Sequence, residues 1–409
     1  MTPKGAGSLR SRCPASLLEL PSGVALKPSA DGLLSVELHW KDGELTSVLP
    51  AEDAQGLVMP RLAEPHAHLD KAFSWPDHPN LSGTYAGAME ANMREHRTRT
   101  ADRVHERSER ALELAWRHGV RAVRSHIDSL GPGAACSWEV LTETRQRWRE
   151  RLELQLVALV PVEHWSTPEG KHLAAQVAAA EGVIGGVIEP PCPGRAPRRA
   201  LRRLLELAED LGCSVDLHID EASEHPAAGV RQLLRVLSTM TVSVPITCSH
   251  ASSLSLLNSA SLRRLGERMA EHQLQVVALP LTNGWLLGRR GQATPVQRPL
   301  APIRQLQDCG VCVAVGGDNV QDPWFPGGNL DPLALMAMSI PLAQLAPWDE
   351  AGIAPFSKDA ARLLGLAWDG VLRLGAPADL IHLHNGGWPE LLSAPPRRKV
   401  LVGGVWVQD

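Results

Sequence analysis

The residues of this sequence best suited to chemistry are histidines and carboxylates at the ends of apolar segments. His66 and His68 stand one residue apart in EPHAHLD, and residues i and i+2 of a β-strand point to the same face. The pair can bind a metal ion, although two of 16 histidines can also fall at this spacing by chance. Later segments end in LHIDE, TCSH and VGGDN, which contribute His218, His250 and Asp318. Because several apolar segments end in a histidine or a carboxylate, we expect these side chains to meet in one common site.

A divalent ion bound by these groups would lower the pKa of a water molecule towards about 7 and supply hydroxide near neutral pH. This chemistry is typical of a metal-dependent hydrolase. No lysine ends the segment GVIGGVIEP, so no carbamylated lysine is available to bridge two metals. We therefore predict one ion per chain, Zn²⁺ or Fe²⁺. Its predicted ligands are His66, His68, His218 and Asp318.

Three side chains are candidates for proton transfer beside this metal. Glu221 lies three residues after His218, and we expect it to carry a proton from water to a leaving group. His250 is expected either to orient the hydroxide or to polarise the substrate. Asp318 can accept the proton of the water with its second oxygen. His126 and Glu64 are instead expected to support the site, since His126 has no obvious partner and Glu64 lies just before His66.

The surrounding pattern predicts a (β/α)₈ barrel. Apolar segments rich in Val, Ile and Leu alternate with helical patterns, as in parallel βα units, and active sites of such barrels lie at the carboxyl ends of the strands. Helices are expected at 103–118, 138–149, 199–211 and 262–272, and a long insertion at 72–100 is either a lid or substrate-contacting loop, or a plain structural helix, which is favoured. Both ends of the chain read as short strands that form a small β-domain. The predicted divisions are 1–55, 56–369 and 370–409.

Composition narrows the class of protein. Of the 409 residues, 44% are hydrophobic and 21% charged, as in an ordinary globular enzyme. The net charge of −4 gives no basis for a nucleic acid or an anionic membrane as partner, and no apolar segment reaches membrane-spanning length. The odd number of scattered cysteines does not suggest a secreted scaffold. We expect a cytoplasmic homo-oligomer that acts on a small molecule.

The segments EPHAHLDKAF, LHIDE, CSH and GGDNVQDPWFP, in this order, resemble the amidohydrolase superfamily and within it the cytosine deaminase group. The resemblance spans nearly the whole chain. It implies the same metal ligands as above, Glu221 as proton shuttle and His250 as the residue that orients hydroxide. It also implies that Trp324 forms a wall of the pocket and that the substrate is a small nitrogen heterocycle.

Two departures from this resemblance concern the substrate. Cytosine deaminases of this group carry a glutamine after the third barrel strand, where this chain has Pro161 and Val162. They also carry two consecutive aspartates at the eighth strand, where this chain has Asn319 after Asp318. We expect Glu163 or His164 to replace the missing amide. Lys71 and Asn319 are further candidates for substrate contact.

The predicted function is hydrolytic deamination of an amino-substituted heterocycle, with release of ammonia. A pterin or isocytosine is favoured over cytosine, because the groups that would contact cytosine have changed. One alternative is another reaction at the same centre, the hydrolysis of a cyclic amide or of an alkylamino-triazine. A second alternative is an inactive barrel that binds a ligand; it is disfavoured because Glu221 and the ligands are all present.

Overall fold

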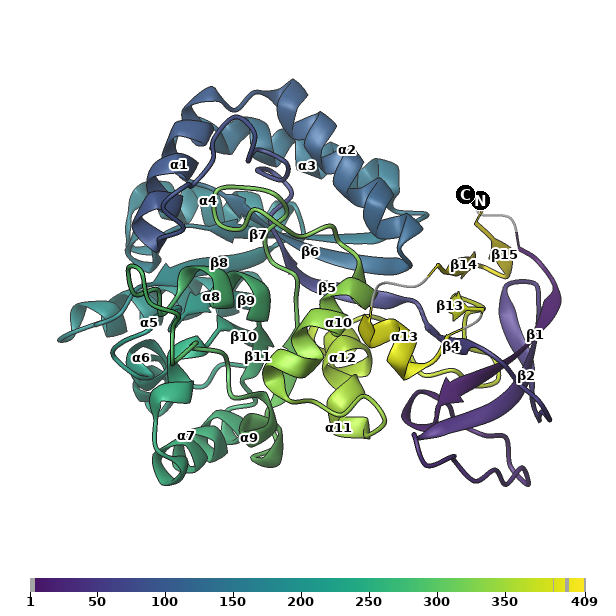
Figure 1. The fold of residues 1–409 in the computed structure, drawn as a ribbon. Coiled ribbons are helices and arrows are strands. Elements are labelled where there is room, and N and C mark those ends of the chain that lie inside the picture. The colour runs from purple at the N-terminus through teal and green to yellow at the C-terminus, as the bar shows by residue number, and fades with distance from the viewer. Residues whose placement is uncertain (1–3, 385, 394–396, 408–409) are drawn as a thin grey trace.

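The computed structural model describes residues 4–384, 386–393 and 397–407. Its larger part is a parallel sheet of eight strands in sequence order, with helices between them (Figure 1). The first and last strands close the ring through a bridge between Ala67 and Asp318, whose backbone N–H donates to the carbonyl of His66 at 2.9 Å. The predicted (β/α)₈ barrel is therefore confirmed. Its strands are β5 (Leu62–Ala67), β6 (Val120–Asp128), β7 (Glu153–Leu159), β8 (Val183–Ile188), β9 (Val215–Ile219), β10 (Ile246–His250), β11 (Gln275–Ala278) and β12 (Cys312–Val315).

The helices follow the amphipathic patterns of the sequence, and the four expected ones are present. The helix at 196–211 buries leucines and alanines against the barrel and ends at Gly212, whose φ of 66° is left-handed and suits glycine. None of the helices in the described ranges is long and apolar enough to cross a membrane. The helices are α1 (Tyr85–Thr98), α2 (Ala101–Arg117), α3 (Ala134–Trp148), α4 (Pro168–Ala179), α5 (Ala196–Leu211), α6 (Ala228–Leu237), α7 (Ser259–Glu271), α8 (Pro280–Leu286), α9 (Ile303–Asp308), α10 (Pro332–Ala343), α11 (Glu350–Ile353), α12 (Lys358–Leu363) and α13 (Trp388–Ser393), with short 3₁₀ helices η1 (Ala15–Leu17), η2 (Val162–Ser166), η3 (Ser252–Leu256) and η4 (Ala354–Phe356).

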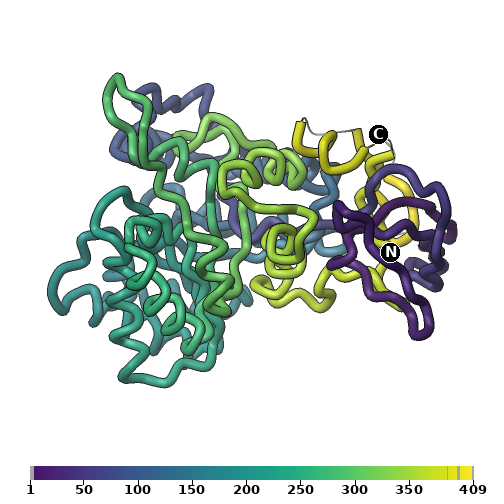
Figure 2. Tube along the Cα trace, turned by 60° about the horizontal axis from the view of Figure 1, so that its bottom comes forward, coloured from purple at the N-terminus to yellow at the C-terminus, as the bar shows by residue number. Residues whose placement is uncertain are grey.

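A second sheet combines both ends of the chain and lies beside the barrel, as Figure 2 shows from another side. Its seven strands have the order β15-β14-β13-β4-β1-β2-β3 and enclose a separate hydrophobic core. The expected β-rich ends thus meet, but β4 pairs with β1 and β13 and so belongs to this sheet, although the predicted division at residue 55 assigned it to the barrel. The strands are β1 (Gly7–Pro14), β2 (Leu33–Lys41), β3 (Glu44–Pro50), β4 (Leu57–Pro60), β13 (Leu380–Leu383), β14 (Lys399–Val402) and β15 (Val405–Trp406).

Candidate active site

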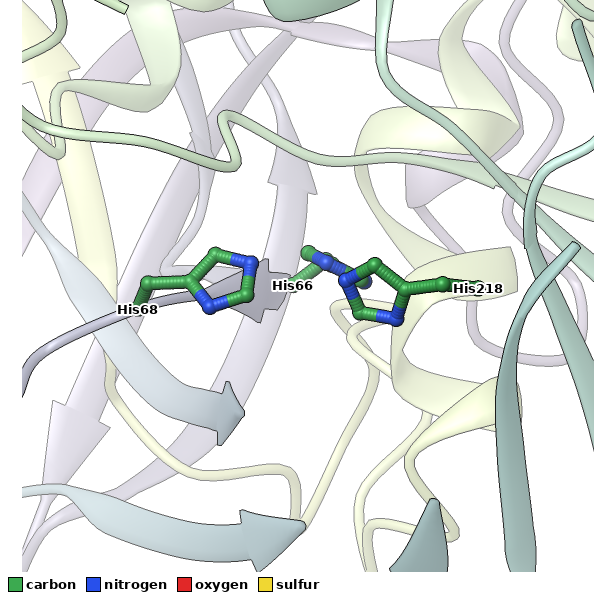
Figure 3. Close-up of side chains that lie close together, drawn as sticks. All are labelled: His66, His68 and His218. Carbon is green, nitrogen blue, oxygen red and sulfur yellow. The ribbon is translucent and has the colours of Figure 1, made fainter. Parts of the chain in front are cut away.

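The barrel brings the predicted metal ligands together at the carboxyl ends of its strands. The imidazoles of His66, His68 and His218 face one another, with ring centroids 4.7 to 5.5 Å apart (Figure 3). One carboxylate oxygen of Asp318 lies 3.2 Å from Nε2 of His68 and 3.7 Å from Nε2 of His66. Ligand atoms around a tetrahedral zinc ion lie about 3.3 Å apart, given metal–ligand bonds of about 2.0 to 2.1 Å. The three imidazoles are thus close enough to hold one metal ion, and Asp318 lies against two of them.

Most of the atoms that would bind the ion lack a hydrogen-bond partner among the described residues. Nε2 of His66, both ring nitrogens of His218 and both oxygens of Asp318 are buried and make no hydrogen bond within those ranges. Unpaired buried polar atoms are costly, and several that converge on one point fit a metal ion. Burial, followed by the charges of neighbouring histidines, lowers the pKa of His66 and of His218 well below its usual value. Both are then neutral at pH 7, which is the form that binds metal.

A chain of hydrogen bonds fixes the ring of His66. Asp216 accepts a bond from Ser249 at 2.7 Å, and the Ser249 hydroxyl lies 3.0 Å from Nδ1 of His66. Since the serine proton is directed to Asp216, the serine oxygen accepts the proton on Nδ1, which leaves the lone pair of Nε2 for the metal. Arg124 donates to the other oxygen of Asp216 at 3.0 Å. Asp216, Ser249 and Arg124 were not predicted.

His126, expected to support the site, lies against it. Its ring stacks on that of His66 with centroids 3.8 Å apart, and its Nε2 lies 3.5 Å from Asp216. His66, His126 and Asp216 are close enough together to hold an ion themselves. However, Arg124 and Ser249 already bond to the oxygens of Asp216. The group formed by His66, His68, His218 and Asp318 is therefore the better metal site.

Glu221 and His250 lie beside this group. One oxygen of Glu221 is 3.5 Å from Nδ1 of His250, and the same nitrogen is 3.0 Å from the side-chain amide of Asn283. Burial, together with the negative charges of Asp318 and Glu189, raises the pKa of Glu221 well above its usual value. Burial also lowers the pKa of His250 to about 4. A carboxyl group of raised pKa thus lies next to an imidazole of lowered pKa, an arrangement suited to proton transfer near neutral pH.

The backbone at two of these strand ends is strained. His250 has a φ of 70° and Asp318 a φ of 65°, in the left-handed region that residues other than glycine seldom occupy. Such strain costs about 1 to 3 kcal/mol and concentrates at functional sites.

Glu64 supports this region, as predicted, because its carboxylate accepts from the backbone N–H of His66 and that of Gly317.

A cavity of about 440 Å³ adjoins the proposed ligands His68, His218 and Asp318, which together with His66 we call the metal group. Trp324 forms part of its wall, as expected, and packs edge-on against Tyr85 of α1 at 5.1 Å between ring centroids. Asn319 also lines the cavity, with its amide held between Thr282 and Asp322. Most of the remaining surface is apolar: Met89, Met93, Leu130, Pro132, Leu159, Val160, Pro161 and Val187.

The residues expected to replace the missing amide do not line this cavity. Glu163 is exposed on the short helix η2, which begins at Val162, and His164 borders a different surface hollow. Glu189, just after β8, and helix α1 line the cavity instead. The insertion is thus a helix that also contributes to the binding surface, two roles that sequence reasoning treated as alternatives.

Lys71 lines the cavity but is engaged in a buried network. Its amine donates to Asp128 at 2.8 Å and lies 3.3 Å from Nδ1 of His68. Burial alone would lower the pKa of Lys71, but the charges of Asp128 and Asp70 raise it above its usual value. Arg99, at the end of α1, bonds to the same two carboxylates, Asp128 and Asp70. Lys71 is therefore part of a charged cluster that connects α1 to the ends of the strands.

The geometry can be compared with known proteins. The family model described as the amidohydrolase family matches residues 109–408. A pterin deaminase of Rhizobium rhizogenes is 30% identical over 390 residues, which cover 92% of this chain and 88% of the relative. An N-isopropylammelide isopropyl amidohydrolase of a Pseudomonas strain is 20% identical over 341 residues, 81% of each chain.

Solved structures share the fold over almost the full length. A 5-methylcytosine deaminase of Klebsiella pneumoniae superposes with a TM-score of 0.83 at 20% identity, over 98% of both chains. An N-isopropylammelide isopropylaminohydrolase of Burkholderia multivorans gives 0.75 at 24% identity, also over 98% of both. With a family match over most of the chain and a histidine cluster at the strand ends that could hold a metal ion, the protein belongs to the amidohydrolase family and is a hydrolase of carbon–nitrogen bonds.

Proposed function

We propose that the protein is a metal-dependent deaminase that removes the exocyclic amino group of a pterin-like heterocycle. The observation that supports this proposal is that Glu221 lines a largely apolar cavity together with His68, His218 and Asp318, at a histidine cluster that could hold a metal ion. A volume of about 440 Å³ accommodates a small flat bicyclic ring, and apolar walls suit its faces.

The metal is held by His66, His68, His218 and Asp318 in this proposal. When bound, a divalent ion supplies a water molecule of lowered pKa at neutral pH. Whether zinc or iron fills the site is set by supply and by fine geometry, since imidazole and carboxylate ligands suit both. Elemental analysis identifies it.

Side chains of the protein then accept and donate the protons of the reaction. His250 accepts at Nδ1 from Asn283, so its proton lies on Nε2, where it can orient the attacking oxygen. Asp318 accepts a proton from the water, and the protonated Glu221 delivers one to the amino group. The oxygen bonds to the ring carbon, the carbon–nitrogen bond breaks, and ammonia leaves. The hydroxyl proton then passes to Glu221 and the proton on Asp318 to the ring nitrogen, so that the ring gains a carbonyl and both carboxyl groups return to their starting states. One water is consumed for each ammonia released.

A pterin-like substrate is supported by two findings. The relative named pterin deaminase matches nearly the whole chain at 30% identity. In addition, Pro161 stands at the cavity wall where a cytosine site is expected to place an amide, so the cavity departs from a cytosine site at this position.

Removal of an alkylamine from a triazine is the second candidate. Relatives named for isopropylammelide share the fold and most of the chain length. The chemistry is the same hydrolysis at the same centre, with an amine in place of ammonia. The two candidates differ in the product that is released.

A product assay on the purified, metal-loaded protein tests the proposal. Ammonia should be released from a pterin or an isocytosine, with kcat/KM clearly above that for cytosine, and no isopropylamine should form from isopropylammelide. The matched control is Glu221→Gln, which should retain the metal and lose turnover. Alkylamine release without ammonia release from any ring would favour the triazine reaction instead.

A further inference from the structure

Two polar side chains of α1 line the cavity and have unused hydrogen-bonding atoms. Asn92 and His96 are 9% and 7% exposed, and neither has been given a role above. Within the described ranges, Oδ1 of Asn92 and Nε2 of His96 are buried without a hydrogen-bond partner. Buried polar atoms in native proteins are normally paired, so unpaired ones beside a cavity indicate a ligand.

The orientation of Asn92 follows from its neighbour. Its amide Nδ2 donates to Asp128 at 3.3 Å. Burial alone would raise the pKa of Asp128, but Lys71 and Arg99 lower it well below its usual value, so Asp128 is ionised and can only accept. The amide nitrogen must therefore face Asp128, and the carbonyl oxygen of Asn92 is the free atom. Asn92 offers the cavity an acceptor.

The tautomer of His96 follows in the same way. A backbone N–H, that of Gly133, donates to Nδ1 of His96 at 3.2 Å. A backbone amide can only donate, so Nδ1 carries no proton and Nε2 carries it. Burial and then the charge of Arg99 lower the pKa of His96, which keeps the ring neutral at pH 7. His96 therefore offers the cavity a donor.

The two residues act from one face of the helix. They are four residues apart, which places them one turn from each other on the same side of α1. Together they present one acceptor and one donor, which is the complement of a carboxamide. A lactam edge, in which a ring N–H stands next to a ring carbonyl, needs such a complement. The segment after β7 lacks an amide for this purpose, since Pro161 lines the cavity there.

We propose that Asn92 and His96 recognise the lactam edge of the substrate, with Oδ1 of Asn92 accepting from the ring N–H and Nε2 of His96 donating to the ring carbonyl. This inference rests on the proposed function, because it concerns the ring held in the same cavity. It assigns the insertion at 72–100 to substrate selection. The two side chains are binding residues and transfer no proton.

Substrates and variants can be combined to test each contact. The probes are 2-amino-4-oxopteridine and its N3-methyl derivative, which keeps the carbonyl and lacks the ring N–H. Asn92→Leu should lower kcat/KM for the parent ring by about 10- to 100-fold and leave that for the methylated ring nearly unchanged. His96→Phe should lower both by a similar factor. Glu90→Gln, on the exposed side of the same helix, should change neither.

A binding measurement separates this inference from the proposed function. Titration calorimetry of both rings into metal-loaded Glu221→Gln needs no turnover. Tighter binding of the parent ring, lost on adding Asn92→Leu, supports the inference even if no ammonia is released by the active protein. Equal binding of the two rings, or an equal loss for both rings in Asn92→Leu, would overturn it, because a structural defect alone lowers both alike.

Discussion

Replacement of Ser249 by alanine tests how the metal group is held. The Ser249 hydroxyl connects Asp216, at 2.7 Å, to Nδ1 of His66, at 3.0 Å. Ser249→Ala removes this connection while all four proposed ligands remain. Without an acceptor for its Nδ1 proton, the His66 ring can rotate or change tautomer, and Nε2 is no longer reserved for the metal.

The expected loss can be worked from these contacts. Removal of the group that orients a metal-binding histidine typically weakens the metal by about 10- to 100-fold, or about 1.4 to 2.8 kcal/mol. Asp216 and His66 also lose a partner in a buried region, which should lower the free energy of unfolding by about 1 to 3 kcal/mol. Turnover at saturating metal should change less than metal affinity, because Glu221 and His250 are untouched.

Competition between metal-free protein and a chromogenic chelator measures the affinity, and denaturant unfolding measures the stability. Ser339→Ala is the matched control, because that buried hydroxyl on α10 has no partner within the described ranges. Ser249→Ala should lose affinity and the control should not. If Ser249→Ala bound metal within about twofold of the wild type, the hydrogen-bond chain would not set the His66 ring and the reasoning would be refuted.

Four more outcomes are expected. Glu221→Gln should bind metal normally and lose turnover by about 10²-fold or more; activity near wild type would move the proton route to another residue. Elemental analysis should give one divalent ion per chain and almost none in a His66→Ala, His68→Ala double variant, whereas two ions in active protein would contradict the site. Arg99→Met should lower the free energy of unfolding by about 3 to 5 kcal/mol, because it leaves buried carboxylates without their positively charged partner. The control is Arg94→Met, at an exposed arginine. Cytosine should give a lower kcat/KM than a pterin or isocytosine, and the reverse order would show that the cavity reads a pyrimidine by contacts not identified above.

Much of the fold was predictable because the chain repeats one local pattern. Buried parallel strands are nearly continuous apolar segments, such as the fully buried Val215–Ile219, and the helices between them are amphipathic. The boundary of the small sheet was less visible. Leu57–Pro60 and Leu62–Ala67 are both short and fully buried, and only Arg61 separates them. Which sheet each joins depends on partners distant in sequence.

The proposed ligands were visible because they end strands, whereas their supports were not. Asp216 carries a signal in retrospect: it is a carboxylate within an apolar strand and lies two residues before His218, on the same face. Ser249 carries none, since serine is common in buried strands. The direction of Glu163 depends on a 3₁₀ turn, and the approach of Asn92 to the cavity depends on how an insertion packs. Both are tertiary features without a local pattern.

The buried charges around Arg99 connect α1 to the strand ends that carry the proposed metal ligands. Arg99 follows α1 and bonds to Glu95 of that helix, to Asp70 just after the His66–His68 strand end, and to Asp128 at the end of β6. The cluster also contains Lys71 and Arg107, so three carboxylates balance three cations. Since isolated buried charges are costly, the cluster is stable only when all its members are in place.

This balance has a consequence for selectivity. Asp128 orients the amide of Asn92 and also bonds to Lys71, whose amine lies next to the metal-site residue His68. We therefore expect a change of charge in the cluster to affect both α1 and the proposed metal ligand His68. The apolar residues of α1, such as Met89, are free of this constraint. We therefore expect changes of substrate preference to be reached more readily through them than through Asn92, whose amide bonds to Asp128 of the cluster.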